Sequence, residues 1–150
     1  MKKFFKILLI VAVVIFTYFL IQHLIVTDKE KIVKAVKTGR EAIEQKDKER
    51  LIDLFSKDYE DETGLTYAQI DSIIDWSFDY FDDFDIFLTK VEVEIEKDRG
   101  EAEFGVKVIG RKEEDLFLLA GTLTAFAKVK LVFKKEEKVW RAISGDLPWT

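Results

Sequence analysis

Residues 91–108 read VEVEIEKDRGEAEFGVKV, and this stretch decides the fold class. Apolar residues alternate with charged or small ones on both sides of a turn expected at residues 98–100. A period of two is typical of strands that bury one face, and two such runs joined by a turn predict an antiparallel hairpin. The register that keeps one face apolar places Ile95 beside Phe104, Val93 beside Val106, Val91 beside Val108 and Glu92 opposite Lys107.

The alternation continues after Asp115, where the sequence predicts one longer strand. The residues expected on its buried side are Leu119, Leu123, Ala125, Ala127, Val129, Leu131 and Phe133. A turn at residues 136–137 would then bring Phe133 beside Trp140 and Leu131 beside Ala142. Most of the opposite side is charged, so we expect an antiparallel sheet with one dry face and one wet face.

Signals for helices precede these strands. Thr27 to Glu30 has the T-x-x-E spacing of a capping box, which predicts a helix to about Glu44. Asp47 is expected to cap a second, short helix. Residues 59–62 could form a short strand. A second capping box spans residues 66–69, and the apolar residues after it share one helical face: Tyr67, Ile70, Ile73, Ile74, Ser77, Phe78, Phe81 and Phe84. Helices gathered on one side of such a sheet define an α+β domain.

Near the start of the chain, residues 7–26 form the apolar run ILLIVAVVIFTYFLIQHLIV, preceded by Lys2, Lys3 and Lys6. Twenty residues at about 1.5 Å each reach about 30 Å, the thickness of a bilayer's hydrocarbon core. A cleaved signal peptide is the alternative, but this run is longer than a signal core and lacks small residues at its far end. We therefore expect residues 1–27 to be an uncleaved transmembrane anchor and residues 28–150 to be the domain.

The charges around the anchor predict its orientation. Three lysines precede the apolar run, so the positive-inside rule predicts a cytoplasmic N-terminus and an extracytoplasmic domain. No Gly, Ser or Pro spacer separates Val26 from the capping box at Thr27. The first domain helix is therefore expected to begin near the lipid headgroups, either as a separate helix or as a continuation of the anchor. Such a placement favours targets in or beside the bilayer.

Composition narrows the possible partners. The chain has no cysteine, which excludes disulfides and thiolate metal sites. Removing Lys2, Lys3 and Lys6 from the formal charge of −5 leaves −8 on the rest, so nucleic acid is not an expected partner. Asn is absent while Lys and Glu are abundant, which favours a thermophilic source. A melting temperature in the mesophilic range would contradict that source.

Two segments are similar to parts of a known family. Residues 40–59, REAIEQKDKERLIDLFSKDY, resemble the opening of nuclear-transport-factor-2-like domains of the SnoaL-like kind. Residues 139–145, VWRAISG, resemble the last strand of these domains, and the order of elements agrees over about residues 29–149. The resemblance implies a cone-shaped, curved antiparallel sheet packed on N-terminal helices, with an open end that often holds a ligand.

Enzymes of that family that isomerise or dehydrate use a pocket carboxylate or histidine together with a tyrosine or a second acid. Here the only histidine, His23, lies in the anchor, and the first domain helix has no tyrosine. A general base would have to be an aspartate such as Asp58 or Asp61, with a pKa raised by burial. Such residues are more often caps and turn formers. We therefore assign no catalytic residue, and no cofactor is expected.

The many aromatic residues could line an apolar cavity or fill it, and the sequence leaves both alternatives open. The residues expected around a pocket, if one exists, are Tyr59, Tyr67, Phe78, Phe81, Phe104 and Trp140. The acidic run at residues 79–85 lacks the glycine turn and distal glutamate of a calcium loop. We expect it to be a solvated face rather than a metal site.

Two functions remain. The missing histidine and tyrosine favour a membrane-anchored, extracytoplasmic, noncatalytic module that binds a protein partner or a small apolar ligand. The alternative is an isomerase or hydratase acting on a hydrophobic substrate near the membrane. A protein partner or a second copy would meet the outer sheet face, where the charges disfavour a large dry interface but leave four apolar residues: Ile109, Phe126, Val132 and Val139.

Overall fold

The computed structural model describes the backbone of residues 1–24 and 27–147. The side chains of His23 and Leu24, the expected end of the anchor at residues 25–26, and residues 148–150 lie outside the described part. The helices are α1 (Lys2–Leu24), α2 (Asp28–Glu44), α3 (Lys48–Ile52) and α4 (Tyr67–Tyr80). The strands are β1 (Asp83–Leu88), β2 (Glu92–Glu96), β3 (Arg99–Lys112), β4 (Asp115–Ala120), β5 (Ala127–Glu136) and β6 (Val139–Asp146).

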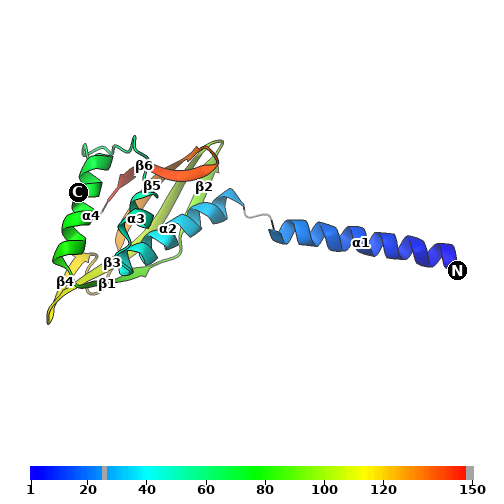
Figure 1. Ribbon diagram of the computed structural model, residues 1–150, viewed down its shortest axis with the longest axis horizontal. Helices are drawn as coiled ribbons and strands as arrows, with labels where there is room; N and C mark the ends of the chain where they lie inside the picture. Colours follow the sequence, from blue (N-terminus) through cyan, green and yellow to red (C-terminus); the bar gives the residue numbers. More distant parts are fainter. Residues whose placement is uncertain (25–26, 148–150) are drawn as a thin grey trace.

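α1 stands apart from the other elements (Figure 1), and its apolar side chains are exposed. The most apolar 18-residue window within Lys2–Gln22 has a mean hydropathy of 2.7, so α1 is long and apolar enough to cross a membrane. Thr27 is extended, with φ −68° and ψ 158°, and its hydroxyl accepts a hydrogen bond from the Glu30 backbone at 3.3 Å. α2 therefore begins as a separate helix at the predicted capping box, and it does not continue α1.

The other helix starts also lie at the predicted caps. Asp47 accepts from the backbone N–H of Arg50 at 3.2 Å, and the Thr66 backbone donates to Gln69 Oε1 at 2.9 Å. The predicted helical face extended to Phe84, but α4 ends at Tyr80. Phe84 is a residue of β1 and is buried there. Residues 59–62 do not form the predicted strand, because their only β-bridge in the described chain is the isolated pair Glu60 and Thr66.

β3 is the central strand of a curved, six-stranded antiparallel sheet. One edge of β3 pairs with β1 and β2, and the other edge pairs with β4 and β5. β6 extends the sheet beyond β5. α2 packs against β1, β2 and β3, and α3 packs against α2, so the helices cover one face of the sheet (Figure 1). The predicted α+β class is confirmed.

The predicted register of the β2–β3 hairpin was wrong by four residues. The pairs are Glu92 with Glu103, Val93 with Ala102 and Ile95 with Gly100. Four is an even step, so every side chain stays on its predicted face. The expected pairing of Glu92 with Lys107 is lost, and Lys130 of β5 instead lies 3.5 Å from Glu101 and 3.9 Å from Glu103.

Gly100 explains the error in register. The sequence suggested a turn residue, but the turn consists of residues 97–98, and Gly100 lies inside β3. A Cβ at Gly100 would lie 2.5 Å from Cδ1 of Ile32. The glycine is therefore needed for the close approach of α2 to the sheet rather than for a turn.

The single long strand predicted after Asp115 is interrupted. β5 pairs with the first half of β3 and β4 with the second half, and residues 121–126 leave the sheet between them. Gly121 has φ 84°, and the Thr122 N–H donates to the Ala125 carbonyl at 2.8 Å across the loop. Leu123 and Ala125, expected on the buried side, are exposed in this loop.

The β5–β6 hairpin also has another register than predicted. Phe133 lies beside Ala142 instead of Trp140, and Leu131 lies beside Gly145. The turn consists of Glu137 and Lys138, which have φ of 48° and 72°. Two successive residues with positive φ are typical of a two-residue hairpin turn, but neither residue type announces one in the sequence.

Candidate functional site

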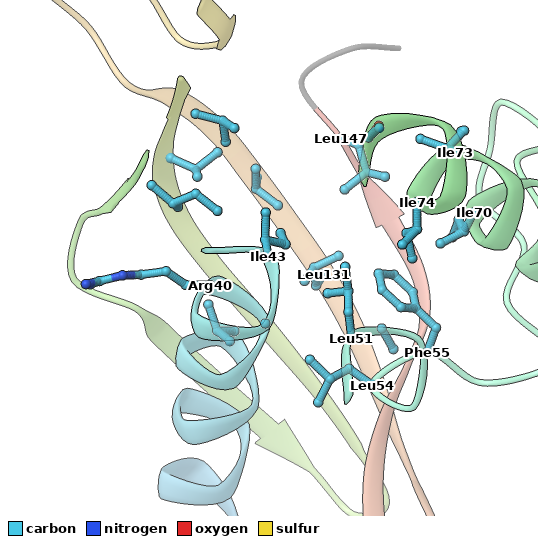
Figure 2. Close-up of a pocket in the computed structure, with 18 of the residues that line it drawn as sticks. Arg40, Ile43, Leu51, Leu54, Phe55, Ile70, Ile73, Ile74, Leu131 and Leu147 are labelled. Atoms are coloured by element: carbon cyan, nitrogen blue, oxygen red, sulfur yellow. The ribbon is translucent and has the colours of Figure 1, made fainter. Parts of the chain in front are cut away.

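A cavity of about 460 Å³ lies between the helices and the sheet. Figure 2 shows Ile43 of α2 on one side, Ile70 and Ile74 of α4 on the opposite side, and Leu131 of β5 between them. β3 contributes Phe104 and Val106 along the floor. The volume falls within the usual range of small-ligand pockets, about 300–1,000 Å³. Of the two alternatives left open by the sequence, the structure has the hollow interior.

The cavity extends along the sheet as far as Phe133 and Ala142, and the end of the sheet beyond them is packed. Ile32 and Ala102 are fully buried there, and Trp140 is 4 % exposed. Asp28 accepts from the Trp140 indole at 3.1 Å and from Lys135 at 3.3 Å. The hydrogen bond from the Trp140 indole is the main cause that lowers the pKa of Asp28; burial opposes it, and Lys135 adds to the lowering. We call Ile32, Gly100, Ala102 and Trp140 the closed end, and the cavity the open end.

The residues expected around a pocket divide into two groups. Phe78, Phe81 and Phe104 line the cavity. Tyr59, Tyr67 and Trp140 are absent from the described lining and belong to the surrounding core cluster instead. The structure thus brings Phe78, Phe81 and Phe104 together at the cavity and places Tyr59, Tyr67 and Trp140 behind its wall.

The two aspartates considered as general bases lie outside the cavity lining. Asp58 is exposed. Asp61 is buried, and it accepts hydrogen bonds from the Thr63 hydroxyl at 2.6 Å, the Leu65 N–H at 3.0 Å and the Tyr59 hydroxyl at 3.4 Å. These bonds hold the loop that leads into α4, which is the role of an Asx turn.

Their electrostatics agree with a structural role. Burial acts to raise the pKa of Asp61, but the hydrogen bonds, that of Thr63 foremost, outweigh it and lower the pKa. Burial and the neighbouring Asp61 raise the pKa of Tyr59, which stays protonated and donates to the carboxylate. A general base poised near neutral pH would need the opposite shift at Asp61.

An aromatic cluster borders the open end. Phe81 contacts the rings of Trp76, Tyr80, Phe84 and Phe117, with centroids 4.9 to 6.3 Å apart. These contacts fix the end of α4 against β1 and β4. Among the lining residues Ile73 is 43 %, Trp76 61 % and Leu119 39 % exposed, so they form an apolar rim.

Asp71 and Asp75 of α4 and Asp83 and Asp85 of β1 are paired with cations. Lys48 lies 3.1 Å from Asp71 and 2.6 Å from Asp75, and hydrogen bonds to Asp75 and then Asp71 raise the pKa of Lys48. Arg111 lies 2.8 Å from Asp85 and 3.5 Å from Asp83. In the described part of the chain, no group of three or more potential ligands could hold a metal ion.

A feature that the sequence reasoning missed lies beside the cavity. A groove of about 350 Å³ shares Arg40, Ile86 and Leu88 with the cavity lining and adds Glu44, Asp85, Phe87 and Phe126. Arg40 donates to Glu44 at 2.8 Å. The sequence contains one signal for this groove, because Arg40 lies on the same helical face of α2 as the apolar residues Val36 and Ile43. A charge at that position marks the edge of the buried face.

No protein-family model and no curated protein sequence matches this chain. Solved structures do match. A proposed scytalone dehydratase from Novosphingobium aromaticivorans has a TM-score of 0.67 and 14% identity over 79% of this chain and 80% of its own. A proposed dehydratase of the NTF2-like family from Streptomyces avermitilis has a TM-score of 0.64 and 17% identity over 77% and 91%. A cystatin-like-fold protein of unknown function from Nostoc punctiforme has a TM-score of 0.61 and 20% identity over 79% and 87%.

These similarities define the class of the molecule by its fold. The domain has the nuclear-transport-factor-2-like, or cystatin-like, α+β fold that the segments at residues 40–59 and 139–145 predicted. At identities of 20% or less, the similarity extends to the fold and not to the activity of the neighbours.

Proposed function

We propose that this protein is a membrane-anchored, noncatalytic binding module that holds a small apolar ligand in its open end. The observation that carries the proposal is the cavity of about 460 Å³, whose described lining is apolar apart from Arg40 and Ser77. Such a lining favours an apolar molecule that fills the cavity, by about 25 cal/mol for each Å² removed from water. Acid–base chemistry needs a titratable group facing the substrate, and the aspartates considered for it lie elsewhere.

The binding proposal is tested by analysing what the full chain carries. We expect an organic extract of the protein purified in lipid nanodiscs to contain a bound apolar molecule that empty nanodiscs lack. Val106→Trp fills the cavity wall and should abolish its recovery, whereas Val139→Trp, at a 45 % exposed site outside the cavity, should retain it. Equal recovery from both variants would contradict the proposal.

The anchor and the orientation of the domain belong to the same proposal. Support comes from α1, whose apolar span is unburied, and from Lys2, Lys3 and Lys6 before it. The chain has no cysteine, so Glu137→Cys in the exposed β5–β6 turn creates a single labelling site. A membrane-impermeant maleimide should label this variant in intact cells. Labelling only after lysis would place the domain in the cytoplasm.

An isomerase or hydratase is the second candidate, because two of the similar structures carry dehydratase names. The two alternatives differ in the fate of the ligand. A binding module returns the extracted molecule unchanged after incubation with fresh protein, whereas an enzyme converts it to a product of different mass or structure. Mass spectrometry and NMR of the recovered molecule distinguish these outcomes.

A further inference from the structure

We propose that the groove beside the cavity binds an uncharged polar head, so that the ligand is an amphiphile with an apolar tail and a hydrogen-bonding but neutral head group. This inference rests on the proposed function and adds the chemical class of the ligand. The apolar cavity and the polar groove share a wall, which consists of Arg40, Ile86 and Leu88. A molecule whose tail fills the cavity can place its head in the groove.

The groove offers both hydrogen-bond donors and acceptors. Arg40 uses Nε to donate to Glu44 at 2.8 Å, and its two terminal nitrogens make no hydrogen bond within the described part of the chain. Figure 2 shows the Arg40 side chain extending away from the labelled apolar residues. Glu44 and Asp85 supply carboxylate oxygens on the same groove. A hydroxyl or amide head can accept from Arg40 and donate to a carboxylate at once.

The charges of the groove disfavour a charged head. The guanidinium of Arg40 is already compensated by Glu44, and Asp85 is compensated by Arg111 at 2.8 Å. An anionic head on the terminal nitrogens of Arg40 would lie beside the carboxylates of Glu44 and Asp85, and a cationic head would lie beside the Arg40 guanidinium, so either head meets a like charge in the groove. An uncharged head leaves both ion pairs intact.

The flanks of the groove suit the start of an apolar tail. Phe87 is 51 % and Phe126 45 % exposed, and both lie on the groove wall. The Nζ of Lys107 lies 5.0 Å from the Phe126 ring centroid, so this ring is held in place by a cation. Burying these rings beneath the first methylene groups of a tail would remove apolar surface from water. The groove is thus matched to the junction between head and tail.

The cavity volume sets the size of the tail. A water-sized group takes about 30 Å³, so about 460 Å³ holds on the order of 15 groups of that size. A linear or branched chain of about 12 carbons therefore fits with its head left outside.

The experiment uses the full chain in lipid nanodiscs and a diazirine-tagged 12-carbon alcohol as the photolabel. Unlabelled 12-carbon alcohol, carboxylate and amine compete for labelling. The competition by the carboxylate and by the amine is expressed relative to that by the alcohol, and these ratios are compared between variants so that partition into lipid cancels. In the wild type we expect the alcohol to compete best. Glu44→Gln leaves Arg40 uncompensated and should shift the carboxylate-to-alcohol ratio about five- to tenfold toward the carboxylate.

Glu41→Gln is the matched control, because Glu41 is an acid of the same helix that pairs with Arg50 and lies outside both hollows. It should leave the ratio unchanged. Equal competition by the three heads, or the same ratio in Glu44→Gln and the wild type, would overturn the inference while leaving the binding module in place. Absence of any competed photolabel in the cavity would instead overturn the binding function itself.

Discussion

The closed and open ends of the domain use similar apolar side chains, yet one end is solid and the other hollow. At the closed end Ile32 is fully buried against Gly100, where even a Cβ would collide with it. At the open end the lining residues Ile73 and Trp76 are 43 % and 61 % exposed, and a cavity remains. Apolar side chains therefore favour removal of a region from water, but they do not determine whether protein or a ligand fills it.

The two ends are also held differently. At the closed end α2 packs directly on the sheet, and Asp28 at its start accepts hydrogen bonds from Trp140 and Lys135. At the open end, α4 is held by polar ties as well: Asp61 fixes the loop before it, and Lys48 of α3 pairs with Asp71 and Asp75. Polar ties of this kind are weaker than a filled core, which suits an element that borders a binding cavity.

Truncation at the closed end should have the largest effect on stability. We expect Ile32→Ala to lower the free energy of unfolding by about 2–5 kcal/mol, because it leaves a void in a packed site. Ile73→Ala, at the rim of the cavity, should cost less than about 1 kcal/mol. Urea unfolding of the full chain in nanodiscs measures both, and equal losses would remove the distinction between the ends.

Enlargement should show the same contrast with a smaller magnitude. Ala102 is fully buried, so Ala102→Leu overpacks the closed end and should cost about 1–3 kcal/mol. Val108 lines the cavity, so Val108→Phe has space to occupy and should change stability by less than about 1 kcal/mol while weakening ligand binding. A stable Ala102→Leu variant would show that the closed end is less tightly packed than its burial indicates.

The polar tie at Asp61 should contribute about 1–2 kcal/mol, because Asp61→Ala leaves the N–H groups of Thr63 and Leu65 without their acceptor. The folded-state pKa of Asp61 lies below its ordinary value of 3.8, so its contribution is present above that pH and is lost as the pH falls through the lower, folded value. The stability difference between wild type and variant should therefore be constant near neutral pH and shrink below about pH 3.8. A difference that grows on acidification would contradict this role.

The smallest effect is expected at Lys48. Lys48→Met removes the ion pairs with Asp71 and Asp75, which lie at a solvated surface. The melting temperature should fall slightly at low ionic strength, and the fall should vanish at about 1 M salt, where the Debye length is about 3 Å. Lys34→Met, an exposed lysine without a resolved ion pair in the described chain, serves as the control. A salt-independent loss would mean that the Lys48 stem contributes packing instead of charge.

Much of the fold could be predicted from local signals. Thr27, Asp47 and Thr66 cap the helices as their spacing predicts, since a cap depends on residues three or four positions apart. The alternation at residues 91–108 assigned the correct faces, because the side chains of a strand point alternately to its two sides. Registers failed, since the partner of Ile95 depends on where α2 crosses β3.

The candidate site was only half predictable. Phe78, Phe81 and Phe104 were placed at the cavity from their helical and strand faces. Tyr59, Tyr67 and Trp140 lie in the core outside the cavity lining, and the sequence does not show how far along the sheet an inward-facing residue lies. Arg40, Glu44 and Asp85 meet across α2 and β1, which lie about forty residues apart in the chain, so no local pattern joined them.

The apolar helix, the capped helices, the faces of the strands and the α+β class follow from local sequence patterns, because each depends on the chemistry of neighbouring residues. The registers, the break at residues 121–126, and the contrast between a packed and a hollow end depend on tertiary contacts. The volume left inside a fold is a small difference between the space that the elements enclose and the side chains that fill it. That difference depends on contacts such as Ile32 with Gly100, between residues far apart in the chain.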